Sequence, residues 1–427
     1  MPSPSLPIAE NRQMSVVVPC YDLRDASLFR PDNPVTSKNS SARSVLLAVA
    51  VATAGVVPAF LTGGLAVQIR AEFGFGEGAL GLAVAVFFAA SALASVASGR
   101  LVERVGPFLG MRLAAAVSAV SLLAVSALAG SWWGLVACLV IGGLGNSISH
   151  PATHLFLARK VGEGRQGLAF GVKQAAIPAA TLLAGLAVPS IATTVGWRWA
   201  FAGCAALALC VVLLVPGGGE VGLRHVKEAR AGDVPLTPLI LLALGIGLGS
   251  AAANPLGAFT VESAVSAGTE VGVAGLLLAL GSAAGVAVRV VAGYLADKMN
   301  SGRLRLVAGM LGVGTAGFVL LASGAVPLLV LGVVLAFAAG WGWPGLFNFA
   351  IVRTNPRAPA AATGITQTGA SSGAAAGPLA FGFVVEGSSF GTAWLLYGAL
   401  ALVAAVTILV GRHMLLRTRL ATPEPYK

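Results

Sequence analysis

Four ionisable side chains, those of His150, His154, Lys173 and Arg289, lie inside long apolar stretches of this sequence. A charged group within such a stretch is costly in a membrane, so each is a functional candidate by default. No Asp or Glu lies deep in the same stretches, and Glu262, near the end of one, comes closest. Two cations without a buried acid favour an anionic ligand, because an anion relieves their mutual repulsion.

Asn146, His150 and His154 are spaced four residues apart, so a helix places all three on one face. Pro151 lacks a backbone N–H and predicts a kink there. This face is a candidate proton or substrate site, since imidazole titrates near neutral pH. Hydrogen-bonded packing histidines are the alternative. Two histidines without a third ligand do not make a metal site, so no metal is expected.

Arg289 belongs to a stripe of small residues at every fourth position, made of Gly281, Gly285, Arg289 and Gly293. Such a stripe predicts contact with a neighbouring helix rather than with lipid. Lys173 lies about two turns inside another apolar stretch. Both cations could contact a ligand in a cavity, or their long side chains could reach the headgroups. Further cavity candidates are Asn254, Trp343 and Gln367, although such residues more often serve packing than ligand contact.

The elements that must position these residues are membrane helices. Hydrophobic residues make up 57% of the chain and charged residues 10%, far from the composition of a soluble domain. Lipid leaves every backbone polar group to be satisfied within its own segment, so stretches of roughly 20 apolar residues should be helices. Twelve are predicted, at about 44–68, 78–98, 108–130, 132–157, 167–191, 198–216, 236–258, 271–293, 304–324, 326–350, 360–384 and 391–412.

A polar octapeptide occurs twice, each time in a short gap between apolar stretches. Gly99-Arg100-Leu101-Val102-Glu103-Arg104-Val105-Gly106 returns 194 positions later as Gly293-Tyr294-Leu295-Ala296-Asp297-Lys298-Met299-Asn300. Pro151 and Pro344 are separated by a similar interval, which indicates two repeated halves. The expected parts are a disordered cytoplasmic tail (1–43), a six-helix half (44–216), a cytoplasmic linker (217–235), a second six-helix half (236–414) and a C-terminal tail (415–427).

The repeated pattern Gly-x-Leu-small-acid-base resembles the loop motif that the major facilitator superfamily carries after its second and eighth membrane helices. The first copy has Glu103 where the pattern usually has Asp, and the second has Asn300 where it has Gly. The resemblance implies an all-α polytopic membrane protein, with 12 transmembrane helices in two pseudo-symmetric six-helix halves. It also implies alternating access around a central site, with the fifth and eighth helices facing one another across the cleft.

The resemblance further implies a gating role for the two motif copies. An acid just past a helix end can face the positive N-terminus of a neighbouring helix. Topology-setting charge is the alternative interpretation. The gating candidates are Gly99, Glu103, Arg104, Gly106, Gly293, Asp297 and Lys298. An arginine four residues before the motif glycine, as at Arg289, also resembles anion carriers of the superfamily, where it binds the substrate carboxylate.

The basic residues are distributed unevenly between the predicted loops. Of 27 Lys and Arg, 23 fall in the two tails and in the loops on the same side as the tails. This bias predicts that both termini are cytoplasmic, and the family resemblance implies a multi-pass protein of the cell (inner) membrane. The formal net charge of +11 is therefore a topology signal, and no nucleic-acid partner is expected.

Together these features predict a secondary transporter for a small solute, by preference a small organic or inorganic anion such as a carboxylate. Efflux of a hydrophobic or amphiphilic compound is the alternative, followed by a non-transporting membrane sensor. No enzyme is expected, because the spans hold no His-Glu-x-x-His pattern, nucleophile elbow or buried acid pair. The expected partners are the solute and the bilayer, with a coupling proton or ion left open. We expect a monomer without a cofactor.

Overall fold

The computed structural model describes residues 38–160, 166–217, 235–299, 301–355 and 358–421, and all regular structure within them is helical. The first half contains α1 (Lys38–Gly64), α2 (Ala66–Phe73), α3 (Glu77–Val105), α4 (Pro107–Leu128), α5 (Trp132–Lys160), α6 (Gln166–Gln174), α7 (Ala176–Ala187), the π-helix η3 (Val188–Ala192) and α8 (Trp197–Leu214). The second half contains α9 (Leu236–Ser266), α10 (Val271–Lys298), α11 (Arg303–Ala322), α12 (Val326–Leu335), the π-helix η5 (Ala336–Gly340), α13 (Pro344–Thr354), α14 (Pro359–Gly387) and α15 (Phe390–Ala421).

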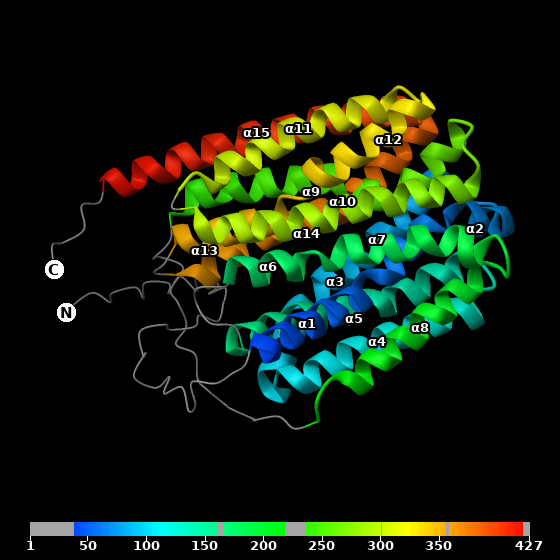
Figure 1. The fold of residues 1–427 in the computed structure, drawn as a ribbon, viewed down its shortest axis with the longest axis horizontal. Helices are drawn as coiled ribbons and strands as arrows, with labels where there is room; N and C mark the ends of the chain where they lie inside the picture. The colour runs from blue at the N-terminus through cyan, green and yellow to red at the C-terminus, as the bar shows by residue number, and fades with distance from the viewer. Residues whose placement is uncertain (1–37, 161–165, 218–234, 300, 356–357, 422–427) are drawn as a thin grey trace, which may run out of the picture.

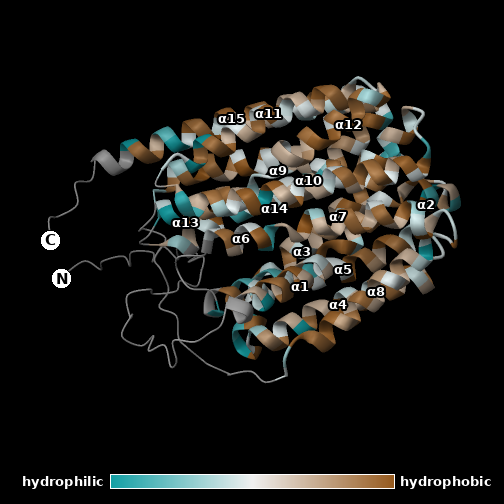
Figure 2. Ribbon diagram, viewed as in Figure 1, coloured by the Kyte–Doolittle hydropathy of each residue, from teal (hydrophilic) through white to brown (hydrophobic). Residues whose placement is uncertain are grey.

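The helices form one bundle in which the two halves lie side by side (Figure 1). We call the face where α1 begins and α15 ends the terminal face, and the face where α2 lies the opposite face. Eleven helical stretches in the described part of the chain are long and apolar enough to cross a membrane. The twelfth predicted span is α14, 29 residues long and richer in glycine and small polar residues. Figure 2 shows hydrophobic residues along the helices and hydrophilic residues concentrated toward the two faces.

Several helices extend beyond the predicted spans. The helix α3 continues to Val105 and α10 to Lys298, so both motif copies lie mostly inside helices and not in loops. The expectation that Glu103 and Asp297 follow a helix end is therefore wrong, because each acid lies in a last helical turn. The helix α3 ends only at Gly106, whose φ of 82° is a conformation that glycine adopts without strain.

The fifth and tenth spans are broken, which the sequence reading did not anticipate. The fifth is interrupted at Ala175, between α6 and α7. Pro178 has no N–H, so the Gln174 carbonyl four residues earlier cannot accept its helical hydrogen bond. The tenth span is not helical between η5 and α13, around Trp341. Pro151, by contrast, lies within the continuous α5.

Close helix contacts join the halves near both faces. Toward the terminal face, a Cβ added to Gly171 on α6 would lie only 2.8 Å from the Gly293 Cα on α10. Toward the opposite face, a Cβ on Gly63 of α1 would lie 2.5 Å from the Ala258 Cα on α9. Glycine at these positions removes the side chain that would hold the helices apart. The two halves therefore touch near both faces.

Candidate functional site

The side chain of Lys173, on α6, is buried between two imidazoles of α5. Lys173 is 2% exposed, and its Nζ lies 3.2 Å from His150 Nδ1 and 3.1 Å from His154 Nε2. An ammonium group has donors only, so each of these ring nitrogens must present a lone pair to a protonated lysine. That requirement places the ring proton of His150 on Nε2 and that of His154 on Nδ1. The geometry thus holds one positive charge against two neutral imidazoles.

Lys173 lines a small cavity within the first half. Its volume is about 40 Å³, enough for a few water molecules but not for an organic anion of several atoms. Asn146 of α5 also lines this cavity, and it donates from Nδ2 to Ser91 Oγ at 2.9 Å. The lining residues are Ala52, Val56, Phe88, Asn146, Ser149, His150, Lys173, Gln174, Ala176 and Ile177. The structure therefore brings Asn146, His150 and Lys173 together, in a closed arrangement that would have to widen to admit a solute.

Arg289 bridges the two helix breaks. Its Nη1 donates to the Gln174 carbonyl at 2.5 Å, and its Nε and Nη2 donate to the Trp341 carbonyl at 3.2 and 2.6 Å. Gln174 belongs to the first half and Trp341 to the second, so one guanidinium connects both. Arg289 is 1% exposed, and its guanidinium carbon lies 5.6 Å from the centroid of the Trp341 ring. Its guanidinium is thus bonded to backbone carbonyls, at positions where regular helical hydrogen bonding stops.

Lys173 and Arg289 do not line the same cavity in this structure. Lys173 lines the cavity described above, whereas Arg289 is not among its lining residues. Gln174 connects the two features, because it lines the cavity and its backbone carbonyl accepts from Arg289. Both cations are buried within the protein, so neither side chain reaches the headgroups in this arrangement.

The three other cavity candidates have different surroundings. Asn254 is 7% exposed and donates from Nδ2 to the Ser250 carbonyl at 2.8 Å. Trp343 is fully buried and donates from Nε1 to the Gly340 carbonyl at 2.8 Å. Gln367 is exposed on α14. None of the three lines the cavity beside Lys173.

Asp297, in the second motif copy, caps a helix of the other half. Its Oδ1 accepts from the Gly167 N–H and its Oδ2 from the Leu168 N–H, both at 2.9 Å. These are free N–H groups in the first turn of α6, where a negative charge also meets the positive end of the helix dipole. Glu103, its counterpart, is exposed and makes no hydrogen bond or ion pair with the described residues. The two motif copies are therefore not equivalent.

The remaining motif residues also differ between the copies. Gly293 packs against α6, whereas a Cβ on Gly99 would meet no atom within 4 Å. Arg104 is exposed at the end of α3. Lys298 is exposed too, and its Nζ lies 4.4 Å from the centroid of the Tyr294 ring. The cross-half contact in this part of the structure is thus made by the second copy.

We expect Asp297→Asn to loosen the terminal face, because asparagine keeps one acceptor but loses the charge that favours the α6 N-terminus. The loss should be about 1 kcal/mol, or roughly a fivefold change in the opening equilibrium. Glu103→Gln is the matched control, since it removes the same charge where no contact is made. Thiol labelling of Ala169→Cys, a buried position on α6, should be faster in Asp297→Asn and unchanged in Glu103→Gln. Equal labelling in both would contradict the role of this cap.

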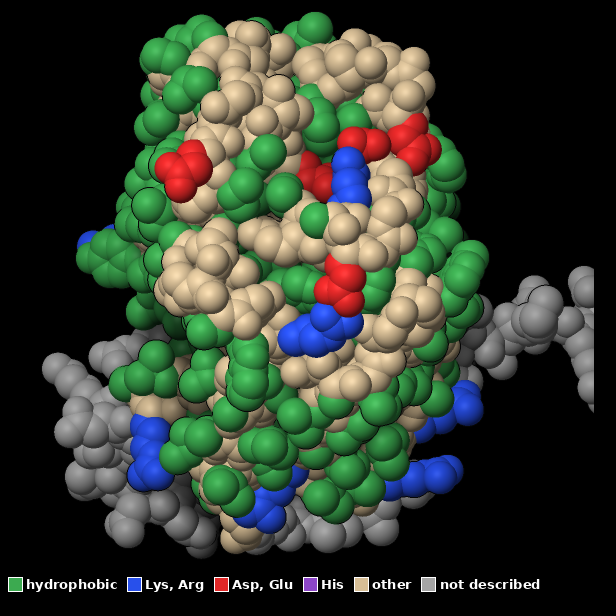
Figure 3. Space-filling view, turned by 90° about the vertical axis from the view of Figure 1, so that its right-hand side faces the viewer, with side chains coloured by type: hydrophobic (Ala, Val, Ile, Leu, Met, Phe, Trp, Pro, Cys, Tyr) green, Lys and Arg blue, Asp and Glu red, His purple; other side chains and the backbone are tan. Residues whose placement is uncertain are grey.

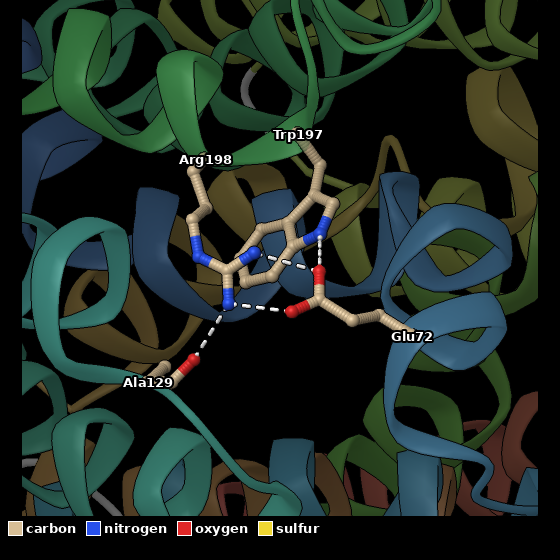
Figure 4. Close-up of polar contacts among 4 residues, drawn as sticks. All are labelled: Glu72, Ala129, Trp197 and Arg198. Carbon is tan, nitrogen blue, oxygen red and sulfur yellow. Dashed lines mark hydrogen bonds and ion pairs between the residues drawn. The ribbon is translucent and has the colours of Figure 1, made fainter.

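Acidic and basic side chains also gather on the opposite face, a feature the sequence analysis missed. Figure 3, which looks onto this face, shows red and blue side chains next to each other near its middle. Glu72 accepts two hydrogen bonds from Arg198, at 2.6 and 2.7 Å, and one from Trp197 Nε1 at 2.9 Å (Figure 4). The Arg198 hydrogen bonds lower the pKa of Glu72, so this pair persists in mildly acidic solution and is lost only as the pH falls through the lowered pKa.

Arg70 forms the second ion-pair group on this face. Its Nη1 lies 2.6 Å from Glu77 Oε1, and its Nη2 lies 3.0 Å from Glu262 Oε1. Glu77 is in the same half as Arg70, whereas Glu262 is on α9 in the other half. The sequence did contain a signal, because Arg70 and Arg198 are the two basic residues that the predicted topology places on the side opposite the tails.

Comparison with known protein families matches nearly the whole described fold. The family model described as Major Facilitator Superfamily matches residues 45–326 and 239–425. The two matches overlap and together cover both halves. No curated protein matches the chain.

Proposed function

The chain belongs to the major facilitator superfamily of secondary transporters, and we propose that the solute it carries is a small organic or inorganic anion, such as a carboxylate. The observation that supports this substrate class is the buried Lys173 ammonium at the cavity wall. Its described partners are two imidazoles, which satisfy hydrogen bonds but supply no negative charge. A buried charge is costly unless it is paired, and a bound anion would supply the missing charge.

The polar groups around Lys173 suit such a ligand. Asn146 and Ser149 line the same cavity and offer amide and hydroxyl donors. His150 can turn its second nitrogen, Nε2, to donate once Nδ1 is engaged by the lysine. A carboxylate accepts several such bonds at once, and a charge-assisted hydrogen bond is worth about 1.5–3 kcal/mol. Together these groups would hold a small anion in the first half, beside the Arg289 bridge.

We further propose that the terminal face is cytoplasmic. Exposed basic side chains lie near the helix ends at this face, including Arg100, Arg104, Lys298, Arg305, Arg353 and Arg417. At the opposite face, Arg70 and Arg198 are each paired with glutamate. An excess of basic residues on one side marks the cytoplasmic side. Reporter fusions after Gly268 and Ser388, at the opposite face, should therefore read as external.

Counterflow in proteoliposomes tests the substrate class. Vesicles are loaded with one unlabelled probe from acetate, lactate, oxalate, succinate, phosphate and sulfate, and uptake of the same labelled probe is measured. For at least one anion, the labelled form should accumulate transiently inside the vesicles above its equilibrium level. The reason is that a carrier exchanging the two forms lets the outward flow of unlabelled anion drive uptake of the labelled one. Uptake of lipophilic dyes without anion exchange would favour efflux of an amphiphilic compound. Binding without exchange would indicate a sensor.

A further inference from the structure

The guanidinium of Arg70 is shared between two carboxylates that belong to different halves of the protein. Glu77, on α3, is held at 2.6 Å with a hydrogen bond. Glu262, on α9, is held at 3.0 Å as an ion pair, and neither of its oxygens has a hydrogen bond among the described residues. The Glu262 side chain is only 4% exposed. Two acids and one base give this group a formal charge of −1, so one added proton would make it neutral.

Arg70 is the cation that contacts Glu262 within the described part of the chain. The other titratable side chains at this end of the elements packed against α9 are Glu72 on α2, Glu386 on α14, Glu270 at the start of α10 and Tyr397 on α15. Glu72 is occupied by Arg198, and the Tyr397 hydroxyl donates to the Gly377 carbonyl. Glu386 lies against Gly76 and Gly78 at the start of α3. None of these groups supplies a positive charge to Glu262.

A cavity at the opposite face adjoins this group. Its volume is about 370 Å³, and its walls include Glu77 and Ser263. Glu77 is the second partner of Arg70, and Ser263 is the next residue after Glu262 in α9. Gln68 of α2 also has a side-chain amide whose buried atoms lack partners. A buried polar atom without a protein partner calls for an explanation, such as a bound water or ion or a functional role.

We propose that Glu262 is a proton-binding site that couples the opposite face of the transporter to the pH on that side. A proton from water in the cavity adds to a carboxylate oxygen of Glu262 and gives the neutral acid, with no covalent bond broken. The ion pair to Arg70 is lost, while Arg70 keeps Glu77 and is never left as a buried unpaired charge. The helix α9 is then released from α2, and the halves separate at the opposite face. This assignment builds on the proposed function only in taking the chain to be a transporter.

Distance measurements between α2 and α9 test this proposal without any solute. Spin labels are attached at Ala71→Cys and Ser266→Cys, both exposed, in a chain whose native cysteines are replaced by alanine. The reconstituted protein in buffer alone is compared at mildly alkaline and mildly acidic pH. In the wild type, acidification should raise the ratio of the longer-distance to the shorter-distance population by about fivefold or more. Glu262→Gln, which mimics the protonated acid in shape and charge, should show the longer distance at both pH values.

Glu72→Gln is the matched control, because it removes an acid on the same face that is paired within one half. It should keep the pH response of the wild type. A pH response that survives in Glu262→Gln, or that disappears in Glu72→Gln, would overturn the proposal. Infrared spectroscopy gives a second readout: the wild type should gain a buried carboxylic-acid band on acidification, and Glu262→Gln should lack it. Failure of every anion in counterflow would leave both readouts unaffected, so the two proposals fail separately.

Discussion

Replacing Lys173 with methionine should abolish anion exchange while leaving the protein folded. Methionine has nearly the length of the lysine stem but no charge, so it keeps most of the packing of a side chain that is 2% exposed. Loss of the charge-assisted bond should weaken anion binding by about one to two decades. Removing a buried charge also ends its desolvation cost, so the melting temperature of the free protein should change little. Binding by thermal shift and exchange in vesicles are the measurements.

Two further variants show whether the charge or the shape of the Lys173 side chain is responsible for anion binding. Lys160→Met removes the same charge from an exposed side chain at the end of α5, outside every candidate site, and it should exchange anions as the wild type does. Lys173→Arg keeps the charge, but a planar guanidinium cannot place one nitrogen between His150 Nδ1 and His154 Nε2. It should therefore retain partial exchange with weaker binding. Wild-type affinity in Lys173→Met would remove the support for an anionic substrate.

The all-α fold in two halves could be predicted because its signals are local. A membrane span is recognisable from the apolar content of one segment, and the repeat from matching positions such as Pro151 and Pro344. The four-residue stripe around Arg289 also predicted correctly that this residue avoids lipid. These features depend on periodicity within a single helix, which the order of residues specifies directly.

The partners of the candidate residues could not be predicted, because they come from helices distant in sequence. Arg289 was a candidate contact for a substrate carboxylate, and in this structure its guanidinium is bonded to carbonyls on α6 and beside η5. One of these acceptors could have been anticipated, since Pro178 leaves the Gln174 carbonyl without its helical donor. The other depends on how the second half docks on the first.

The two motif copies also show that contacts between distant helices could not be predicted from the sequence. Glu103 and Asp297 occupy equivalent positions in the repeat, and the sequence treats them alike. Only Asp297 reaches a helix N-terminus across the interface between the halves. Which copy makes the contact depends on the relative position of the halves, and that position changes as a transporter cycles.

Arg289 is expected to hold the two halves together at the helix breaks, so Arg289→Ala should strongly reduce both stability and exchange. Alanine leaves the Gln174 and Trp341 carbonyls buried without donors, at about 1–3 kcal/mol for each unsatisfied group. Arg289→Lys should fold, but one ammonium nitrogen cannot reproduce a fork that reaches carbonyls on both halves. The cysteine at Ala169 should therefore be labelled faster in Arg289→Lys than in the wild type.

Arg303 provides the matched control for this bridge. It donates from Nε and Nη2 to the Ala296 carbonyl at 3.1 and 3.0 Å, and also to the Met299 carbonyl, with all partners in the second half. Arg303→Lys thus loses the same kind of bond without separating the halves. It should lower the melting temperature modestly and leave Ala169→Cys labelling unchanged. If Arg289→Lys and Arg303→Lys are labelled at the same rate, the guanidinium of Arg289 stabilises its local fold only, and the bridge between the halves must be assigned to other contacts.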